Sequence, residues 1–183
     1  MCWQVRRYFL VRHATASSWA PEAMLTDRGR AEAEALAGRL AGFRFDSAWG
    51  SDLPRATETA EIILDGRTQP SLRLSEVLRE VGLPREGGWP SLRAAEQAAW
   101  ERETVDGLGE RLAGWLRAIE GDARGNILVV SHAGPLRVLV CLLLGLPPRC
   151  HWSFRVEPAS LTVVERGDDM GTLSLLNDRC HLR

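Results

Sequence analysis

Residues 8–14 read Tyr-Phe-Leu-Val-Arg-His-Ala, and residues 127–133 read Ile-Leu-Val-Val-Ser-His-Ala. Each stretch contains a short apolar run rich in β-branched or aromatic residues, which is typical of a buried strand. Each run leads to a histidine that is followed by a small residue. In an open α/β sheet, ligands bind outside the carboxyl ends of the strands. The two stretches therefore predict that His13 and His132 emerge at one edge of a sheet.

Helical patterns alternate with strand patterns along the rest of the chain. Thr26 is a good N-cap for the first of the helices, and residues 76–89 are rich in Gly and Pro and are expected to form a functional loop. Further strands are expected at 45–50, 72–74, 153–156, 161–165 and 172–176. Helices are expected at 27–41, from Pro54 onward, at 91–103, at 105–119 and from Gly134 onward. The alternation predicts an α/β fold of three layers, with a mainly parallel sheet between helices on both faces.

The length and composition of the chain are those of one domain. Its 183 residues are 45% hydrophobic, which is enough to bury a sizeable core, and no repeat or low-complexity linker divides them. We therefore expect a single domain over residues 1–183, in which residues 76–120 form a lid or a flanking helical region.

The charges and the apolar runs disfavour several partners. The chain has 23 basic residues, all of them arginine, against 24 acidic ones, so no net field attracts nucleic acid or an anionic membrane. The longest apolar run, 136–146, is shorter than the roughly 20 residues that span a bilayer. The N-terminus lacks the pattern of a signal peptide, and the four cysteines lack the spacing of a zinc site. We expect a cytoplasmic protein that binds neither nucleic acid nor a membrane.

Two arginines accompany the two histidines. Arg12 directly precedes His13, and Arg55 lies at an expected strand-to-helix turn. A single strand-end histidine or a single surface arginine is usually structural. Two guanidiniums and two imidazoles at the same edge suit a dianionic phosphoryl group, and gathering them without an anion is costly. Arg12, His13, Arg55 and His132 therefore indicate a phosphate site.

The same segments resemble the signature motifs of the histidine phosphatase (phosphoglycerate mutase-like) superfamily. The family's Arg-His-Gly strand end corresponds to residues 12–14, and its Ser-Asp-Leu-x-Arg-Ala-x-x-Thr-Ala stretch corresponds to residues 51–60. The second strand end, Ser-His-Gly, corresponds to residues 131–134, and residues 25–33 are similar to a Leu-Thr-x-x-Gly-x-x-Gln-Ala segment. The matches follow the family's order over residues 8–146. The resemblance implies the phosphoglycerate mutase-like α/β fold.

The resemblance also implies a mechanism. His13 would attack the phosphorus atom and carry a phosphohistidine. The phosphoryl oxygens would be held by Arg12, Arg55 and His132. Glu80 aligns with the family's proton donor and would protonate the leaving oxygen. Neither a metal ion nor a cofactor is implied.

The chain departs from the family pattern in the first motif. Ala14 replaces the usual glycine, and no Trp-Asn pair follows nearby, so the family's asparagine contact to phosphate is missing. Ser17 or Ser18 is expected to take its place, and we favour Ser17. Ala133, at the start of the expected helix, is also placed among the phosphate-binding residues.

The loop that carries Glu80 also departs from the family pattern. Glu76 and Glu86 remain alternatives to Glu80 as the proton donor.

We favour a metal-independent phosphomonoesterase that acts on a small metabolite such as a sugar phosphate or α-ribazole phosphate. Phosphoglycerate mutases of the family carry longer insertions than this chain, and a non-catalytic binding module would be expected to lose a central residue. A protein phosphohistidine phosphatase is a further alternative. A small phosphomonoester is the expected partner, and the oligomeric state, a homodimer included, is open.

Overall fold

The computed structural model describes residues 5–68, 70–81, 103–121, 125–167 and 170–183. Among these residues, one six-stranded sheet has the strand order β3-β2-β4-β1-β5-β6. The strands are β1 (Arg6–Arg12), β2 (Ser47–Gly50), β3 (Leu72–Leu74), β4 (Asn126–Ser131), β5 (Leu161–Arg166) and β6 (Gly171–Asp178). Strands β1 to β4 pair in parallel, whereas β5 and β6 are added antiparallel. The predicted α/β sheet is confirmed, and it is parallel except along one side.

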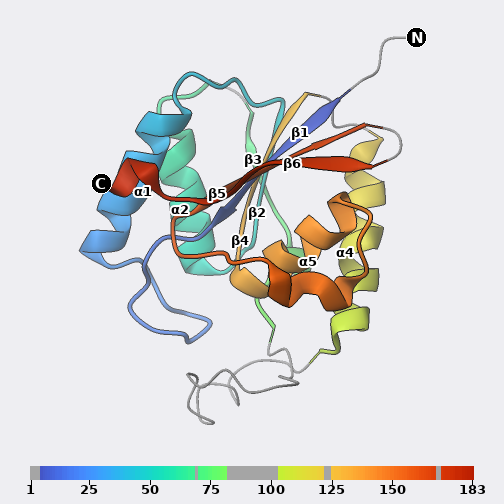
Figure 1. The fold of residues 1–183 in the computed structure, drawn as a ribbon. Coiled ribbons are helices and arrows are strands. Elements are labelled where there is room, and N and C mark those ends of the chain that lie inside the picture. The colour runs from blue at the N-terminus through green and yellow to red at the C-terminus, as the bar shows by residue number, and fades with distance from the viewer. Residues whose placement is uncertain (1–4, 69, 82–102, 122–124, 168–169) are drawn as a thin grey trace.

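Helices cover both faces of this sheet (Figure 1). Helices α1 (Asp27–Leu40) and α2 (Pro54–Leu64) lie on one face, and α4 (Val105–Glu120) and α5 (Ala133–Leu143) lie on the other. Successive side chains of β1 divide between the two cores, because a strand has a two-residue period. Phe9 and Val11 pack with α1 and α2, while Tyr8 and Leu10 pack with α4 and α5. A central strand buried on both faces must be apolar throughout, which explains its sequence.

The helix starts follow the local sequence. The hydroxyl oxygen of Thr26 accepts a hydrogen bond from the Gly29 N–H at 3.0 Å and so caps α1. Thr104 caps α4 in the same way, accepting from the Gly107 N–H at 3.0 Å. Helix α2 begins with Pro54, a residue that lacks the N–H that would be unsatisfied there. The predicted helices in these segments are confirmed.

The pairing of β1 with β4 brings the two histidines together. Arg12 lies opposite Ser131 in the parallel register, and the His13 N–H donates to the Ser131 carbonyl at 2.9 Å. His13 and His132 therefore leave the sheet at the same level, at the carboxyl ends of neighbouring strands.

The expected strand at 153–156 is wrong, and the expected loop at 76–89 begins with a helical turn. Residues 153–156 form no strand: a short 3-10 helix, η2 (Pro148–Ser153), comes first, and the Val156 carbonyl then accepts from the Arg12 side chain instead of a strand neighbour. The start of the expected loop 76–89 is regular, because Glu76–Leu78 forms the 3-10 helix η1 with Leu78 fully buried. In both cases a tertiary contact decided the local structure.

Part of the expected architecture lies outside the described residues. This holds for the remainder of the loop from residue 82 onward and for nearly all of the helix expected at 91–103. The single domain and the lid or flanking region at 76–120 therefore stay predictions. Within the described part of the chain, no helix combines the length and the apolar character needed to cross a membrane.

Gly29 provides a test of how α1 packs against the loop that follows His13. A Cβ atom at Gly29 would overlap the carbonyl oxygen of Thr15, whereas a Cβ at Gly38 of the same helix would meet no atom within 4 Å. We expect Gly29→Ala to lower the free energy of unfolding by about 1–3 kcal/mol. Gly38→Ala should raise it by up to about 1 kcal/mol, since alanine favours a helix interior. Urea denaturation measures both, and equal effects would contradict the close approach.

Candidate active site

His13 directly follows β1 and is almost fully buried, with 4% of its surface exposed. Its Nδ1 lies 2.8 Å from the Ala14 carbonyl oxygen, and its Nε2 lies 3.2 Å from Nε of Arg55. A carbonyl oxygen only accepts, so Nδ1 donates and carries the ring proton. An arginine Nε only donates, so Nε2 accepts with its lone pair. The geometry leaves Nε2 as the nucleophilic nitrogen of a neutral imidazole.

The surroundings of His13 favour this neutral form. Burial, followed by the positive charges of Arg12 and Arg55, lowers the pKa of His13 well below its ordinary value of 6.5. A protonated ring would lose its hydration and would face two guanidiniums. His13 is therefore unprotonated on Nε2 at neutral pH, as attack on phosphorus requires.

His132 emerges beside His13 from the end of β4. The two ring centroids are 5.0 Å apart, and Nε2 of His132 lies 2.9 Å from the hydroxyl oxygen of Ser51. Burial, followed by repulsion from the neighbouring His13 in its protonated form and from the two arginines, lowers the pKa of His132 well below its ordinary value. Its Nδ1 is buried without a hydrogen-bond partner among the described residues.

Arg12, the last residue of β1, places a buried guanidinium next to the histidines. Its Nη1 donates to the Val156 carbonyl at 2.9 Å, and its side chain lies 5.7 Å from the ring centroid of Trp19. Burial lowers the pKa of Arg12 to about 10, which still leaves the group charged at neutral pH. A buried charge of this kind is costly unless an opposite charge accompanies it.

Arg55 enters the site from the first turn of α2. It is 1% exposed, and besides its bond to His13 it donates from Nη1 to the Ala20 carbonyl at 3.0 Å. Burial lowers the pKa of Arg55, and the negative charge of Glu80 opposes that shift. The structure therefore brings together all four predicted residues of the phosphate site, with Glu80 close enough to act on both arginines.

Glu80 follows η1 and docks against the start of α5. Its Oε1 accepts hydrogen bonds from the backbone N–H groups of Gly134 at 3.1 Å and Val81 at 3.2 Å. Burial raises the pKa of Glu80, while Arg12 and then Arg55 act in the opposite direction. A carboxyl group with a raised pKa can hold a proton, which is the property of a general acid.

Two contacts fix the segment that carries Glu80. Nε of Arg79 donates to Oδ1 of Asp52 at 2.8 Å, which ties the end of η1 to the turn before α2. The Ser131 hydroxyl donates to the Leu78 carbonyl at 2.7 Å, in a buried position directly before His132. Both partners belong to the segments that supply Arg55 and His132, so these contacts fix Glu80 relative to those two residues.

The alternatives for the proton donor are placed differently. Glu76 is exposed and lies 3.4 Å from Arg79, with which it forms a surface ion pair. Glu86 lies outside the described residues. Of the two carboxyl groups that the structure describes, Glu80 is the one that it brings to Arg12 and Arg55.

All the predicted phosphate contacts stay predictions, and Ser17, Ser18 and Ala133 lie as follows. Ser17 is exposed, and its backbone N–H donates to the Met24 carbonyl at 2.9 Å. The hydroxyl oxygen of Ser18 accepts from the Ala20 N–H at 3.2 Å, within its own loop. Ala133 is the first residue of α5, where a helix presents free N–H groups to an anion.

The departure at Ala14 has a structural explanation. Its side chain is fully buried beside Leu25, Ala33 and Ala159, and its N–H donates to the Thr59 hydroxyl at 3.1 Å. A methyl group is therefore accommodated in the core, away from the imidazole.

Several supporting residues escaped the sequence analysis. Asp52 and Thr59 lie inside a motif that had been singled out, but nothing in their spacing revealed their partners. The contacts of Arg12 with Val156 and Trp19 join segments that are distant in the chain, so no local pattern could indicate them. Within the described residues, no group of three or more His, Cys, Asp or Glu side chains could hold a metal ion.

Comparison with known proteins agrees with this geometry. The sequence profile of the histidine phosphatase superfamily (branch 1) matches residues 8–179. The chain belongs to the histidine phosphatase superfamily. The predicted family is confirmed.

Histidine phosphatases with different names are similar to this chain. An adenosylcobalamin/α-ribazole phosphatase of Salmonella typhimurium is 30% identical, over 94% of this chain and 96% of that protein. A 2,3-bisphosphoglycerate-dependent phosphoglycerate mutase of Brucella melitensis is 31% identical, over 78% of this chain and 84% of that protein. The crystal structure of the α-ribazole phosphatase from Shigella flexneri superposes with a TM-score of 0.78 at 27% identity, covering 94% of this chain and 96% of that chain. The predicted phosphoglycerate mutase-like fold is confirmed.

The lowered pKa of His13 and the raised pKa of Glu80 predict a bell-shaped pH dependence of kcat/KM on an alkyl phosphate. As the pH falls through the lowered pKa of His13, the nucleophile is protonated, so the acid limb should lie below 6.5. As the pH rises through the raised pKa of Glu80, the proton donor is lost, so the alkaline limb should lie above 4.5. The profile is corrected for the second ionisation of the substrate.

Glu80→Gln should remove the alkaline limb and leave the acid limb in place, because the amide does not titrate. Glu76→Gln is the matched control and should keep both limbs. An alkaline limb that survives in Glu80→Gln would assign the proton donor to another group.

Proposed function

We propose that this histidine phosphatase is a metal-independent phosphomonoesterase that forms a phosphohistidine on Nε2 of His13. The observation that carries the proposal is the orientation of the His13 ring. One nitrogen is committed as a donor to a backbone carbonyl, and the other presents its lone pair beside a buried guanidinium. An imidazole held in this way needs no base to activate it.

In the first step, Nε2 of His13 attacks phosphorus and the bond from phosphorus to the leaving oxygen breaks. The phosphoryl oxygens take the places around Arg12, Arg55 and His132, and a phosphoryl oxygen replaces Nε2 of His13 as the acceptor for the Arg55 N–H. The positive charges stabilise the oxygens in the transition state. Glu80 gives its proton to the leaving oxygen, so the product departs as an alcohol.

In the second step, water attacks the phosphohistidine. Glu80, now a carboxylate, takes a proton from the water, the bond from phosphorus to Nε2 breaks, and inorganic phosphate leaves. His13 and Glu80 return to their starting forms. The charge for both steps comes from the two guanidiniums, which would also repel a divalent cation, and this supports a reaction without a metal ion.

A small phosphorylated metabolite is the substrate class that we favour, with α-ribazole phosphate as a candidate. The names of the similar phosphatases support it, and so does Trp19, which is 43% exposed next to Arg12. An exposed indole beside the phosphate site can stack on a planar group such as the benzimidazole base of α-ribazole. The loop that carries Trp19 is fixed by the hydrogen bond from Arg55 to Ala20.

Phosphate release from a panel of monoesters in the presence of EDTA tests the proposal. We expect turnover of at least one member of a panel that contains α-ribazole phosphate, nucleoside 5′-phosphates, a hexose phosphate and 3-phosphoglycerate. His13→Ala should lose at least about 10³-fold in kcat, because water cannot replace a positioned nucleophile.

The controls separate the alternatives. Restoration by a divalent ion after loss of activity in EDTA would contradict the metal-independent reaction. Isomerisation of 3-phosphoglycerate in place of phosphate release would establish the mutase. Release of phosphate from a phosphohistidine-containing protein but from no small ester would move the substrate class to phosphoproteins.

A further inference from the structure

The segment after η2 encloses the end of β1 on the side away from β4. The Ala159 N–H lies 3.1 Å from the Arg12 carbonyl oxygen and 3.2 Å from the His13 carbonyl oxygen, and the Arg12 N–H donates to the Ser160 carbonyl at 3.3 Å. The Val156 carbonyl accepts from Nη1 of Arg12 at 2.9 Å, in a buried position. Residues 156–160 therefore contact both the backbone and the guanidinium of Arg12.

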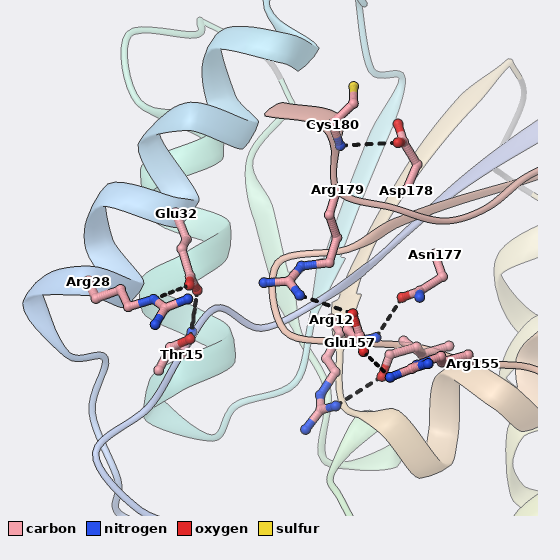
Figure 2. A network of polar contacts seen from close by, with 11 residues as sticks. Arg12, Thr15, Arg28, Glu32, Arg155, Glu157, Asn177, Asp178, Arg179 and Cys180 are labelled. Carbon is pink, nitrogen blue, oxygen red and sulfur yellow. Dashed lines mark hydrogen bonds and ion pairs between the residues drawn. The ribbon is translucent and has the colours of Figure 1, made fainter. Parts of the chain in front are cut away.

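A side chain from the end of β6 fixes this segment. Oδ1 of Asn177 accepts from the Glu157 N–H at 2.7 Å, and the Asn177 N–H donates to the Thr162 hydroxyl at 3.1 Å. Asn177 has a φ of 51°, in the left-handed region that asparagine and glycine tolerate best. Figure 2 shows Asn177 and Arg179 directed toward Glu157, with Arg12 beside them.

The carboxylate of Glu157 is held from two sides. Arg155 pairs with one oxygen at 2.6 Å and Arg179 with the other at 3.0 Å. The hydrogen bond from Arg179 is the main cause of a lowered pKa of Glu157, so the group stays ionised. Its negative charge acts on Arg12 as well, raising the pKa of that guanidinium against the effect of burial. Glu157 is thus fixed by its backbone and by its side chain, directly next to the carbonyl that accepts from Arg12.

We propose that Asn177 is a positioning residue for Arg12 and that it acts through Glu157 and the Val156 carbonyl. Arg12 is long, and its buried Nε has no partner among the described residues. Its guanidinium is held by the hydrogen bond to Val156 and by the contact with the Trp19 ring. Loss of the Asn177 bond frees the Glu157 N–H and lets the Val156 carbonyl move with it. The inference rests on the proposed role of Arg12 in holding phosphoryl oxygens. It adds to the residues that support the phosphate site one from β6, which is separated from β1 by β5.

Asn177→Gly is the informative variant because glycine accepts the left-handed backbone while the amide is lost. Replacement by alanine would add backbone strain and confuse the result. We expect Asn177→Gly to raise KM for p-nitrophenyl phosphate and the inhibition constant of inorganic phosphate by about 3- to 10-fold, the effect of one hydrogen bond. Asn177→Asp keeps an acceptor oxygen in the same place and should bring both constants back to within about 2-fold of the wild type.

Asn126 is the matched control, because its side chain also forms a hydrogen bond with a backbone group: its Nδ2 donates to the Arg44 carbonyl at 2.7 Å, at the amino end of β4 and so at the opposite end of the strand from His132. Asn126→Gly should lower the Tm and leave both constants within about 2-fold of the wild type. A merely structural role of Asn177 would lower the Tm and the fraction of active enzyme without changing the inhibition constant of phosphate.

The outcomes separate this inference from the proposed function. An active wild-type enzyme in which Asn177→Gly binds phosphate as tightly as the wild type would overturn the positioning role alone. Equal weakening in Asn177→Gly and Asn126→Gly would also overturn it. A wild-type protein that neither hydrolyses the ester nor binds phosphate would instead contradict the proposed function.

Discussion

The hydrogen bond from Nε of Arg55 to Nε2 of His13 is the interaction on which the rest of the site depends. It can form only if Nε2 is unprotonated, and the bond from Nδ1 to the Ala14 carbonyl secures that state. It also requires a guanidinium that is 1% exposed, and burying such a charge costs several kcal/mol unless other groups compensate. The Ala20 carbonyl compensates in part. A phosphoryl dianion would complete the compensation, so the free site is already arranged for its ligand.

Burial acts in opposite directions on the bases and the acid of this site. It lowers the pKa of His13 and His132, because their charged forms are cations, and it raises the pKa of Glu80, because its charged form is an anion. The two arginines strengthen the first effect and weaken the second. One buried, positively charged group of side chains therefore keeps His13 unprotonated and lets the neighbouring carboxyl group hold a proton, which are the two states that phosphoryl transfer to histidine needs.

The sequence predicted the place of a site residue wherever that place depends on the neighbouring residues in the chain. Apolar runs that lead to His13 and His132 predicted the shared sheet edge, and Pro54 predicted the helix start that delivers Arg55. The site of Glu80 followed from family resemblance, since its contacts with Gly134 and with both arginines join segments far apart in the chain. Tertiary contacts also explain what the sequence analysis predicted wrongly or missed.

The segment 153–156 has the composition of a strand, yet its last carbonyl serves the Arg12 side chain, and the sheet is completed without it. Nothing near Asn177 in the sequence indicates a role in the site, because its partner is Glu157 and its influence passes through a backbone carbonyl. Local patterns thus predicted the four residues that the structure brings together, and only the folded chain reveals the residues that hold them in place.

Trapping of the covalent intermediate tests the central claim most directly. The enzyme is mixed with an aryl phosphate carrying a labelled phosphoryl group, quenched with base within milliseconds, and digested for mass spectrometry. The account predicts a base-stable, acid-labile phosphoryl group on Nε2 of His13, which is absent from His13→Ala. A label on serine, aspartate or cysteine, or full turnover by His13→Ala, would contradict it.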